Sequence, residues 1–75
     1  MVYEIEFFQW DDAAPNGAEI IRRHSDEFPT LEAARIFGFA NTGTPDSPRE
    51  ADGFLIYENG VMVSRAEIRH RFPNA

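Results

Sequence analysis

Apolar and polar residues alternate along the first ten positions of the chain. Three apolar residues share one face of an extended backbone and two glutamates lie between them: Tyr3, Ile5 and Phe7, with Glu4 and Glu6. Alternation of this kind is typical of a β-strand with one buried face, and it predicts a strand over residues 2–10. Phe8 and Trp10 fall on the face of the glutamates, which indicates either a bulge near Phe8 or a cover over the far end of the second face.

A turn and a second strand follow. Residues 11–17 (DDAAPNG) combine Pro15, which fixes φ, with Asn16 and Gly17, which tolerate positive φ. Residues 18–24 (AEIIRRH) contain two β-branched side chains and no helical stripe. The first part of the chain is therefore predicted to be an antiparallel hairpin.

Helical spacing begins after Pro29. Thr30 is suited to cap a helix over residues 31–41, because its hydroxyl can accept a bond from a free first-turn N–H. An apolar stripe recurs at i, i+4 and i+7, formed by Ala33, Phe37 and Ala40. We expect Phe37 to anchor this stripe on the sheet and Phe39 to lie well away from it. Gly38 is expected inside the helix at a cost of about 1 kcal/mol.

The second hairpin carries the strongest local signal. Residues 41–52 (NTGTPDSPREAD) have no large apolar side chain and are predicted to form a flexible loop. Beyond them, residues 53–58 and 61–68 flank the pair Asn59-Gly60, which favours a type I′ turn. This turn predicts three cross-strand pairs: Glu58 with Val61, Tyr57 with Met62, and Ile56 with Val63.

The tail from residue 66 to 72 fits two structures. Ser64 and Glu67 fit a capping box, which favours a short helix. Alternating apolar and charged residues over the same stretch favour a continued strand. We expect the strand to continue to about Ile68.

The predicted fold class is α+β, with the order β-β-α-β-β, two antiparallel hairpins forming a sheet, and one helix packed on one face. The layout resembles small uncharacterised bacterial domains of unknown function, in which two strands joined by a glycine turn precede a helix opening with P-[ST]-L-E-A-A-R and a final hairpin. The matching stretches are Tyr3 to Phe7, Asn16-Gly17, Pro29 to Arg35 and Gly53 to Val63. The resemblance implies a fold and a bacterial source, and it implies nothing about chemistry.

Composition and charge limit the classes of function that the chain can have. The 75 residues suffice for a single domain over 1–75, and the absence of cysteine excludes disulfides and thiolate metal sites. Thirteen acidic residues against seven basic ones give a net charge of −6, which works against nucleic-acid and anionic-membrane binding. The apolar runs are too short to cross a membrane and no signal peptide opens the chain, so we expect a cytoplasmic protein.

No catalytic, cofactor or metal site is predicted. His24 and His70 lack metal-ligand spacing, and no serine lies in a nucleophile turn. His24 and Ser25 are adjacent on a strand and should point to opposite faces. Glu4 and Glu6 share a strand face, as solvated carboxylates routinely do. We therefore expect a non-catalytic protein without a cofactor.

An interaction face is predicted instead. A single helix covers one side of the sheet, yet large apolar residues lie on the other: Phe8, Trp10, Leu55, Tyr57 and Met62. Monomeric proteins seldom expose such a patch, so we expect a partner protein over it, most simply a second copy in a two-fold contact. The alternative is single-stranded nucleic acid, held by strand aromatics and by the C-terminal arginines Arg65, Arg69 and Arg71; the acidic balance makes it the second choice.

Overall fold

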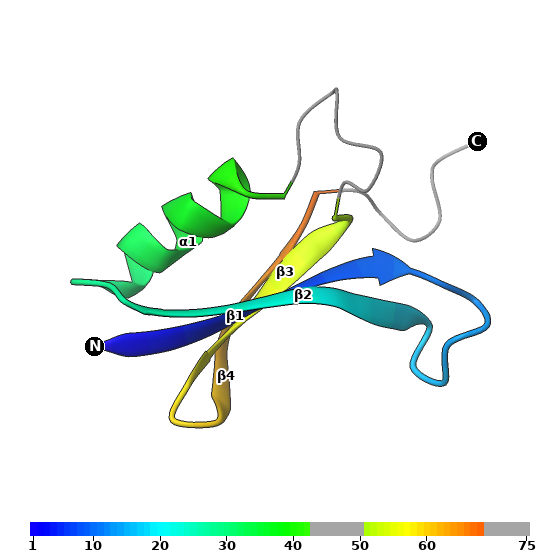
Figure 1. The fold of residues 1–75 in the computed structure, drawn as a ribbon, viewed down its shortest axis with the longest axis horizontal. Coiled ribbons are helices and arrows are strands. Elements are labelled where there is room, and N and C mark those ends of the chain that lie inside the picture. Colours follow the sequence, from blue (N-terminus) through cyan, green and yellow to red (C-terminus); the bar gives the residue numbers. More distant parts are fainter. Residues whose placement is uncertain (43–50, 69–75) are drawn as a thin grey trace.

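The computed structural model describes residues 1–42 and 51–68, and its elements follow the predicted order (Figure 1). They are β1 (Val2–Trp10), β2 (Ala18–Glu27), α1 (Leu31–Ala40), β3 (Gly53–Glu58) and β4 (Val61–Glu67). The strands form one antiparallel sheet in the order β2-β1-β3-β4, and α1 lies against one side of it. The α+β class and the β-β-α-β-β order are confirmed.

The core lies between α1 and the two central strands. Alternate residues of β1 and β3 point towards the helix and are buried, as the alternation in the sequence predicted. Register places Ile5 opposite Ile56 and Phe7 opposite Phe54, and all four side chains are fully buried. Tyr3, Ala34, Ala51 and Ala66 complete the buried cluster.

The irregularity near Phe8 is a bulge, and it lies in β2. Phe7 pairs with Arg22 whereas Phe8 pairs with Ile20, so Ile21 is an extra residue on β2. The bulge lets Ile21 pack against the core while Ile20 faces the opposite side of the sheet. The alternation of β1 is therefore unbroken, and the second strand is longer than predicted: it ends at Glu27 rather than at residue 24, because Glu27 pairs with Val2 at the start of β1.

The β3–β4 turn has the predicted form. Asn59 and Gly60 both have positive φ, and Glu58 pairs with Val61 and Tyr57 with Met62. The third predicted pair is wrong, because Ile56 pairs with Ser64. Val63 is the extra residue of a second bulge, which moves every later residue of β4 one position along its partner strand.

Helix α1 is rotated relative to the predicted stripe. Thr30 caps it as predicted, accepting a hydrogen bond of 3.1 Å from the N–H of Ala33. The residues buried against the sheet are Ala34 and Gly38, whereas Ala40 is exposed. A Cβ on Gly38 would lie 2.7 Å from the Phe54 ring, so the glycine lets the helix approach the sheet closely at this point. The predicted stripe of Ala33, Phe37 and Ala40 did not include this contact. The helix ends at Ala40, one residue before the predicted end.

Two arginine side chains connect α1 to the sheet, one from β2 to the C-terminal end of the helix and one from the middle of the helix to β4. The Arg22 guanidinium lies over the Phe7 ring and donates a hydrogen bond to the carbonyl of Asn41, beyond the last helical turn. At the other face of the helix, Arg35 donates to the Ser64 hydroxyl on β4. These contacts tie the helix to β2 and to β4, the two edges of the sheet.

Parts of two sequence predictions lie outside the described residues. Of the predicted loop over 41–52, residues 43–50 are not described; its two ends meet where the carbonyl of Thr42 accepts a hydrogen bond of 2.6 Å from Ala51. The tail beyond Ile68 is also outside, and β4 ends at Glu67, one residue earlier than expected.

Candidate functional site

A hollow of about 370 Å³ lies on the side of the sheet away from α1. Within residues 1–42 and 51–68, no helix covers this side (Figure 1). Ten residues from all four strands and the first turn line the hollow: Glu6, Phe8, Trp10, Asn16, Ala18, Ile20, Leu55, Tyr57, Met62 and Arg65. We call it the aromatic hollow. The five residues predicted to form an interaction face all line it, so the fold brings that set together.

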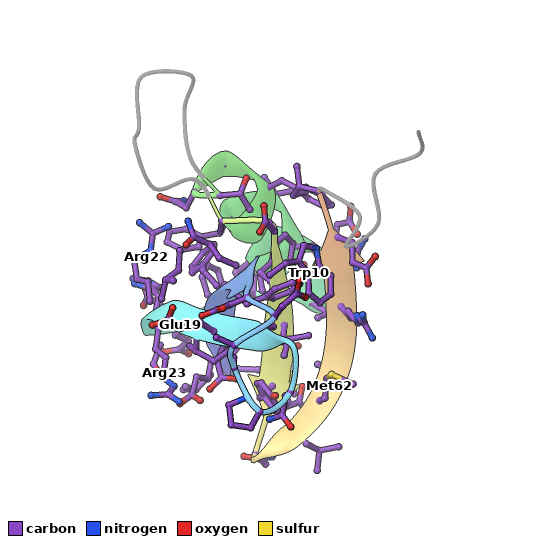
Figure 2. The ribbon with its side chains drawn as sticks, turned by 90° about the vertical axis from the view of Figure 1, so that its right-hand side faces the viewer. Trp10, Glu19, Arg22, Arg23 and Met62 are labelled. Atoms are coloured by element: carbon purple, nitrogen blue, oxygen red, sulfur yellow. The ribbon has the colours of Figure 1, made fainter. Side chains whose placement is uncertain are left out.

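Strand register explains why these residues converge. Glu4 pairs with Tyr57, and Tyr57 pairs in turn with Met62, which makes one row across the sheet. Successive rows on the same face add Leu55 and Arg65, and then Phe8. Trp10 of β1 and Met62 of β4 (both labelled in Figure 2) thus belong to one surface, although they are far apart in the sequence.

Phe8 is buried without any cover from the helix. Its side chain is 3% exposed, because the ring lies across Gly53 on the neighbouring strand. A Cβ on Gly53 would come within 2.6 Å of the Phe8 ring and 2.3 Å of the Ala66 carbonyl oxygen. Phe8 also packs edge-on against Trp10, with 4.9 Å between the ring centroids. The floor of the aromatic hollow is therefore formed by the protein's own aromatic rings.

Asp52 fixes the end of β1 on which Trp10 sits. Its carboxylate accepts a 2.7 Å hydrogen bond from the backbone N–H of Trp10, and its own N–H donates to the carbonyl of Phe8. The carbonyl of Asp52 accepts from Ile68. One residue before β3 thus joins β1 to the end of β4, and this holds the aromatic pair in place.

A charged row crosses the middle of the open face. The Glu6 carboxylate is 14% exposed and accepts a 2.8 Å hydrogen bond from the Arg23 guanidinium on β2. This bond and the charge of Glu6 raise the pKa of Arg23. Burial, followed by the charge and hydrogen bonding of Glu6, raises the pKa of Tyr57. Glu6 and Arg23 thus form an ion pair at one edge of the hollow.

Of the three arginines predicted to contact nucleic acid in the alternative interpretation, one lies among the described residues. Arg65 lines the aromatic hollow and forms an ion pair with Glu67, two residues along the same strand. Arg69 and Arg71 lie outside the described residues. The structure therefore places one of the three predicted anion contacts beside the strand aromatics.

A second hollow, of about 230 Å³, lies between β2 and the last turn of α1. Its lining residues are Phe7, Arg22, His24, Phe37 and Asn41. His24 stacks on Phe37 with 4.5 Å between the ring centroids, and its Nε2 atom is 3.6 Å from the carboxylate of Asp26 without a hydrogen bond. Arg22 is already bound to the helix end. The groups in this hollow serve to join β2 to α1.

No catalytic constellation is found among the described residues. Register puts His24 opposite Ile5 and Ser25 opposite Glu4, so the two side chains point to opposite faces, as expected. No cluster of three or more His, Asp or Glu side chains that could hold a metal ion occurs in the described part of the chain. Nor does that part contain a helix long and apolar enough to cross a membrane.

Comparison with known proteins adds no relative. No family model matches the chain, and neither the curated proteins nor the solved structures contain a significant match to it. The resemblance to small bacterial domains stays an expectation, and the geometry of the aromatic hollow is the basis on which a function can be proposed.

Sequence reasoning missed several residues that shape the hollow. Ile20 and Ala18 reach it because of the β2 bulge, and Asn16 reaches it from the turn. Gly53 and Asp52 hold Phe8 and Trp10 through contacts that join distant segments. The sequence signal that could have found more of the lining is the alternation of side chains along a strand. Every second residue of β1 and β3, on the side of Glu4 and Glu6, belongs to this face.

Proposed function

We propose that this protein is a small, non-catalytic interaction module that associates with a second copy of itself through the aromatic hollow. The observation that carries the proposal is the exposed apolar side chain of Met62 in the lining of the hollow. Val61, Met62 and Val63 on β4 are 63%, 52% and 41% exposed, and Met62 also lines the hollow. An apolar hollow and an exposed apolar side chain therefore occur on one face of the chain, and a two-fold contact would bring each against the other.

Charge supports the same surface. The chain carries a net charge of −6, so two copies repel each other over most of their surfaces. The ten residues that line the aromatic hollow include one acid, Glu6, and one base, Arg65. Contact through this neutral surface avoids most of the repulsion that contact elsewhere would bring.

Sedimentation velocity over a concentration series tests the proposal. We expect the sedimentation coefficient to rise from that of an 8.6 kDa monomer to that of a dimer as the concentration reaches tens of micromolar. A monomer throughout that range would exclude self-association as the function.

A second candidate is the binding of single-stranded nucleic acid, and one observation favours it. Arg65 lies beside Trp10 and Tyr57, an arrangement in which bases stack on aromatic rings while a guanidinium contacts phosphate. Fluorescence anisotropy with labelled oligonucleotides at low salt tests it, because phosphate contacts are strongest there. No binding at tens of micromolar protein would exclude this candidate.

A further inference from the structure

We infer that the second copy places its Met62 side chain in the aromatic hollow, and that each hollow of the dimer is filled in this way. This inference rests on the proposed function and names the residue that makes the contact. Its first support is position: Met62 pairs with Tyr57, so its side chain stands on the hollow's own face of the sheet. Its second support is exposure, since 52% of Met62 is left in water by the residues described.

The chemistry of the side chain fits the lining. A thioether makes favourable contacts with aromatic rings, and its unbranched chain adapts to an irregular cavity. Phe8, Trp10 and Tyr57 supply three such rings, with Leu55 and Ile20 between them. The two charged groups of the lining are already paired, Glu6 with Arg23 and Arg65 with Glu67, so an apolar side chain leaves no charge without its partner.

Two-fold symmetry makes the contact reciprocal. Met62 of one copy enters the hollow of the other, and the partner's Met62 enters the first, so every dimer contains two identical contacts. Removing either the methionine or the hollow therefore removes both contacts from a dimer of identical chains. A mixture of the two variants restores one contact, which gives the inference a specific test.

The first experiment compares the M62E variant with wild type by sedimentation. We expect M62E to weaken dimerisation about tenfold or more, because it places a charge against an apolar lining. The matched control is I36E, which adds the same charge at a residue that is 62% exposed on α1, on the opposite side of the sheet. I36E should dimerise like wild type, and circular dichroism should show both variants folded.

The second experiment mixes M62E with W10A. Trp10 is the single tryptophan of the chain, so all tryptophan emission in the mixture comes from the M62E copy, whose hollow keeps its three aromatic rings and has a glutamate in place of Met62. Addition of W10A, which keeps its methionine, should shift this emission to the blue and produce a mixed dimer in native mass spectrometry. Addition of the double variant W10A/M62E should do neither. Should W10A fail to fold, Y57S replaces it and native mass spectrometry is the measurement.

The outcomes separate this inference from the proposed function. A monomeric wild type overturns both. A wild-type dimer that M62E leaves intact overturns the Met62 contact and leaves self-association standing. If M62E and I36E weaken dimerisation equally, the effect is due to the added charge, and this result would also overturn the Met62 contact. Loss in M62E alone, with recovery in the mixture, supports it.

Discussion

Because Gly53 has no side chain, the ring of Phe8 can lie across it on the neighbouring strand. Phe8 faces the side of the sheet that α1 does not cover, yet it is buried because its ring lies over Gly53. The same ring supports Trp10 edge-on. A glycine that packs under an aromatic ring on the next strand thus takes the place of a helix as cover.

Replacement of Gly53 by alanine should destabilise the protein and disturb the hollow. The new Cβ would lie 2.3 Å from a backbone oxygen, so the strands must shift, at an expected cost of about 2–3 kcal/mol. Displacement of Phe8 should also change the emission of Trp10. The control is Gly60→Ala, where no atom lies within 4 Å and the cost is that of the positive φ, about 1–2 kcal/mol. Unchanged Trp10 emission in Gly53→Ala would contradict the packing described.

The tyrosines predict how stability changes at high pH. The pKa of Tyr57 is raised by burial and then by Glu6, and that of Tyr3 by burial and then by Glu58. A raised pKa means that the folded state disfavours the phenolate, so stability is full below the unfolded value of about 10 and falls as the pH rises above it. In Glu6→Gln the pKa of Tyr57 should move back towards 10 and the fall should become shallower.

The measurement is a series of thermal melts between about pH 8 and 11, with an NMR titration of the Tyr57 ring. Glu19→Gln is the control, because it removes one negative charge from the opposite face of β2. An identical Tyr57 titration in Glu6→Gln and wild type would show that Glu6 does not act on this tyrosine.

Helix α1 depends on the sheet for its position. Ten residues form a helix too short to be stable in isolation, so its contacts with β1 and β3 and the two arginine tethers decide where it lies. Leu31 and Phe37 pack beside the buried Ala34 and Gly38, whereas Phe39 is 47% exposed and touches Phe54 edge-on. The two phenylalanines of the helix thus contribute unequally.

Phe37→Ala should lower stability more than Phe39→Ala. Phe37 contacts Phe28 and His24 as well as the core, but it is only partly buried, so we expect a loss near the lower end of the roughly 3–5 kcal/mol seen for buried phenylalanine. A chain of this size has about 4–11 kcal/mol in total. Thermal melts followed by circular dichroism measure both variants, and a larger loss in Phe39→Ala would contradict the observed packing.

The sequence predicted the presence and order of the strands, but not the full length of β2 or the positions of the extra residues in the two bulges. Alternation and the Asn59-Gly60 pair depend on neighbouring residues, and they predicted β1 and the β3–β4 turn correctly. The extra residues Ile21 and Val63 have no local signal, because a bulge is fixed by what the partner strand and the core require. Gly38 was taken as a cost to the helix, since its contact with Phe54 joins segments distant in sequence.

The candidate site likewise contains some features that the sequence predicted and others that it did not. Alternation along the strands was enough to predict five of the ten residues that line the hollow. The pairing of Glu6 with Arg23 follows from the register of β1 with β2, and the burial of Phe8 follows from the adjacency of β1 and β3. The order of strands in a sheet cannot be obtained from alternation, so these features could not be predicted.

The molecule as a whole is acidic, and among the described residues Glu6 is the one acidic residue that lines the hollow. The net charge of −6 opposes association at every orientation, while the lining of the hollow balances Glu6 with Arg65. The charged edge strand β2, from which Glu19, Arg22 and Arg23 project (Figure 2), is a poor surface for pairing with another strand. The dependence of affinity on salt concentration should therefore distinguish self-association from nucleic-acid binding.

Raising the salt concentration from about 0.1 M to about 1 M shortens the screening length from about 10 Å to about 3 Å. Dimerisation should tighten several-fold, because repulsion between two acidic copies is screened while the apolar contact remains. Binding to an oligonucleotide should weaken steeply over the same range. Sedimentation and anisotropy at both salt concentrations measure the two effects, and a dimer that dissociates at high salt would show that ion pairs rather than apolar contacts hold it.

The central place of β1 in the order β2-β1-β3-β4 has a consequence for synthesis on the ribosome. When β1 leaves the exit tunnel, its neighbour β2 follows within a few residues. The other edge of β1 stays unpaired until β3 emerges, and Phe54 and Ile56, against which the helix packs, arrive with that same strand. A nascent chain that ends before β3 would expose Ile5 and Phe7, so folding of this sheet should wait until β3 and β4 have emerged and then occur in one step.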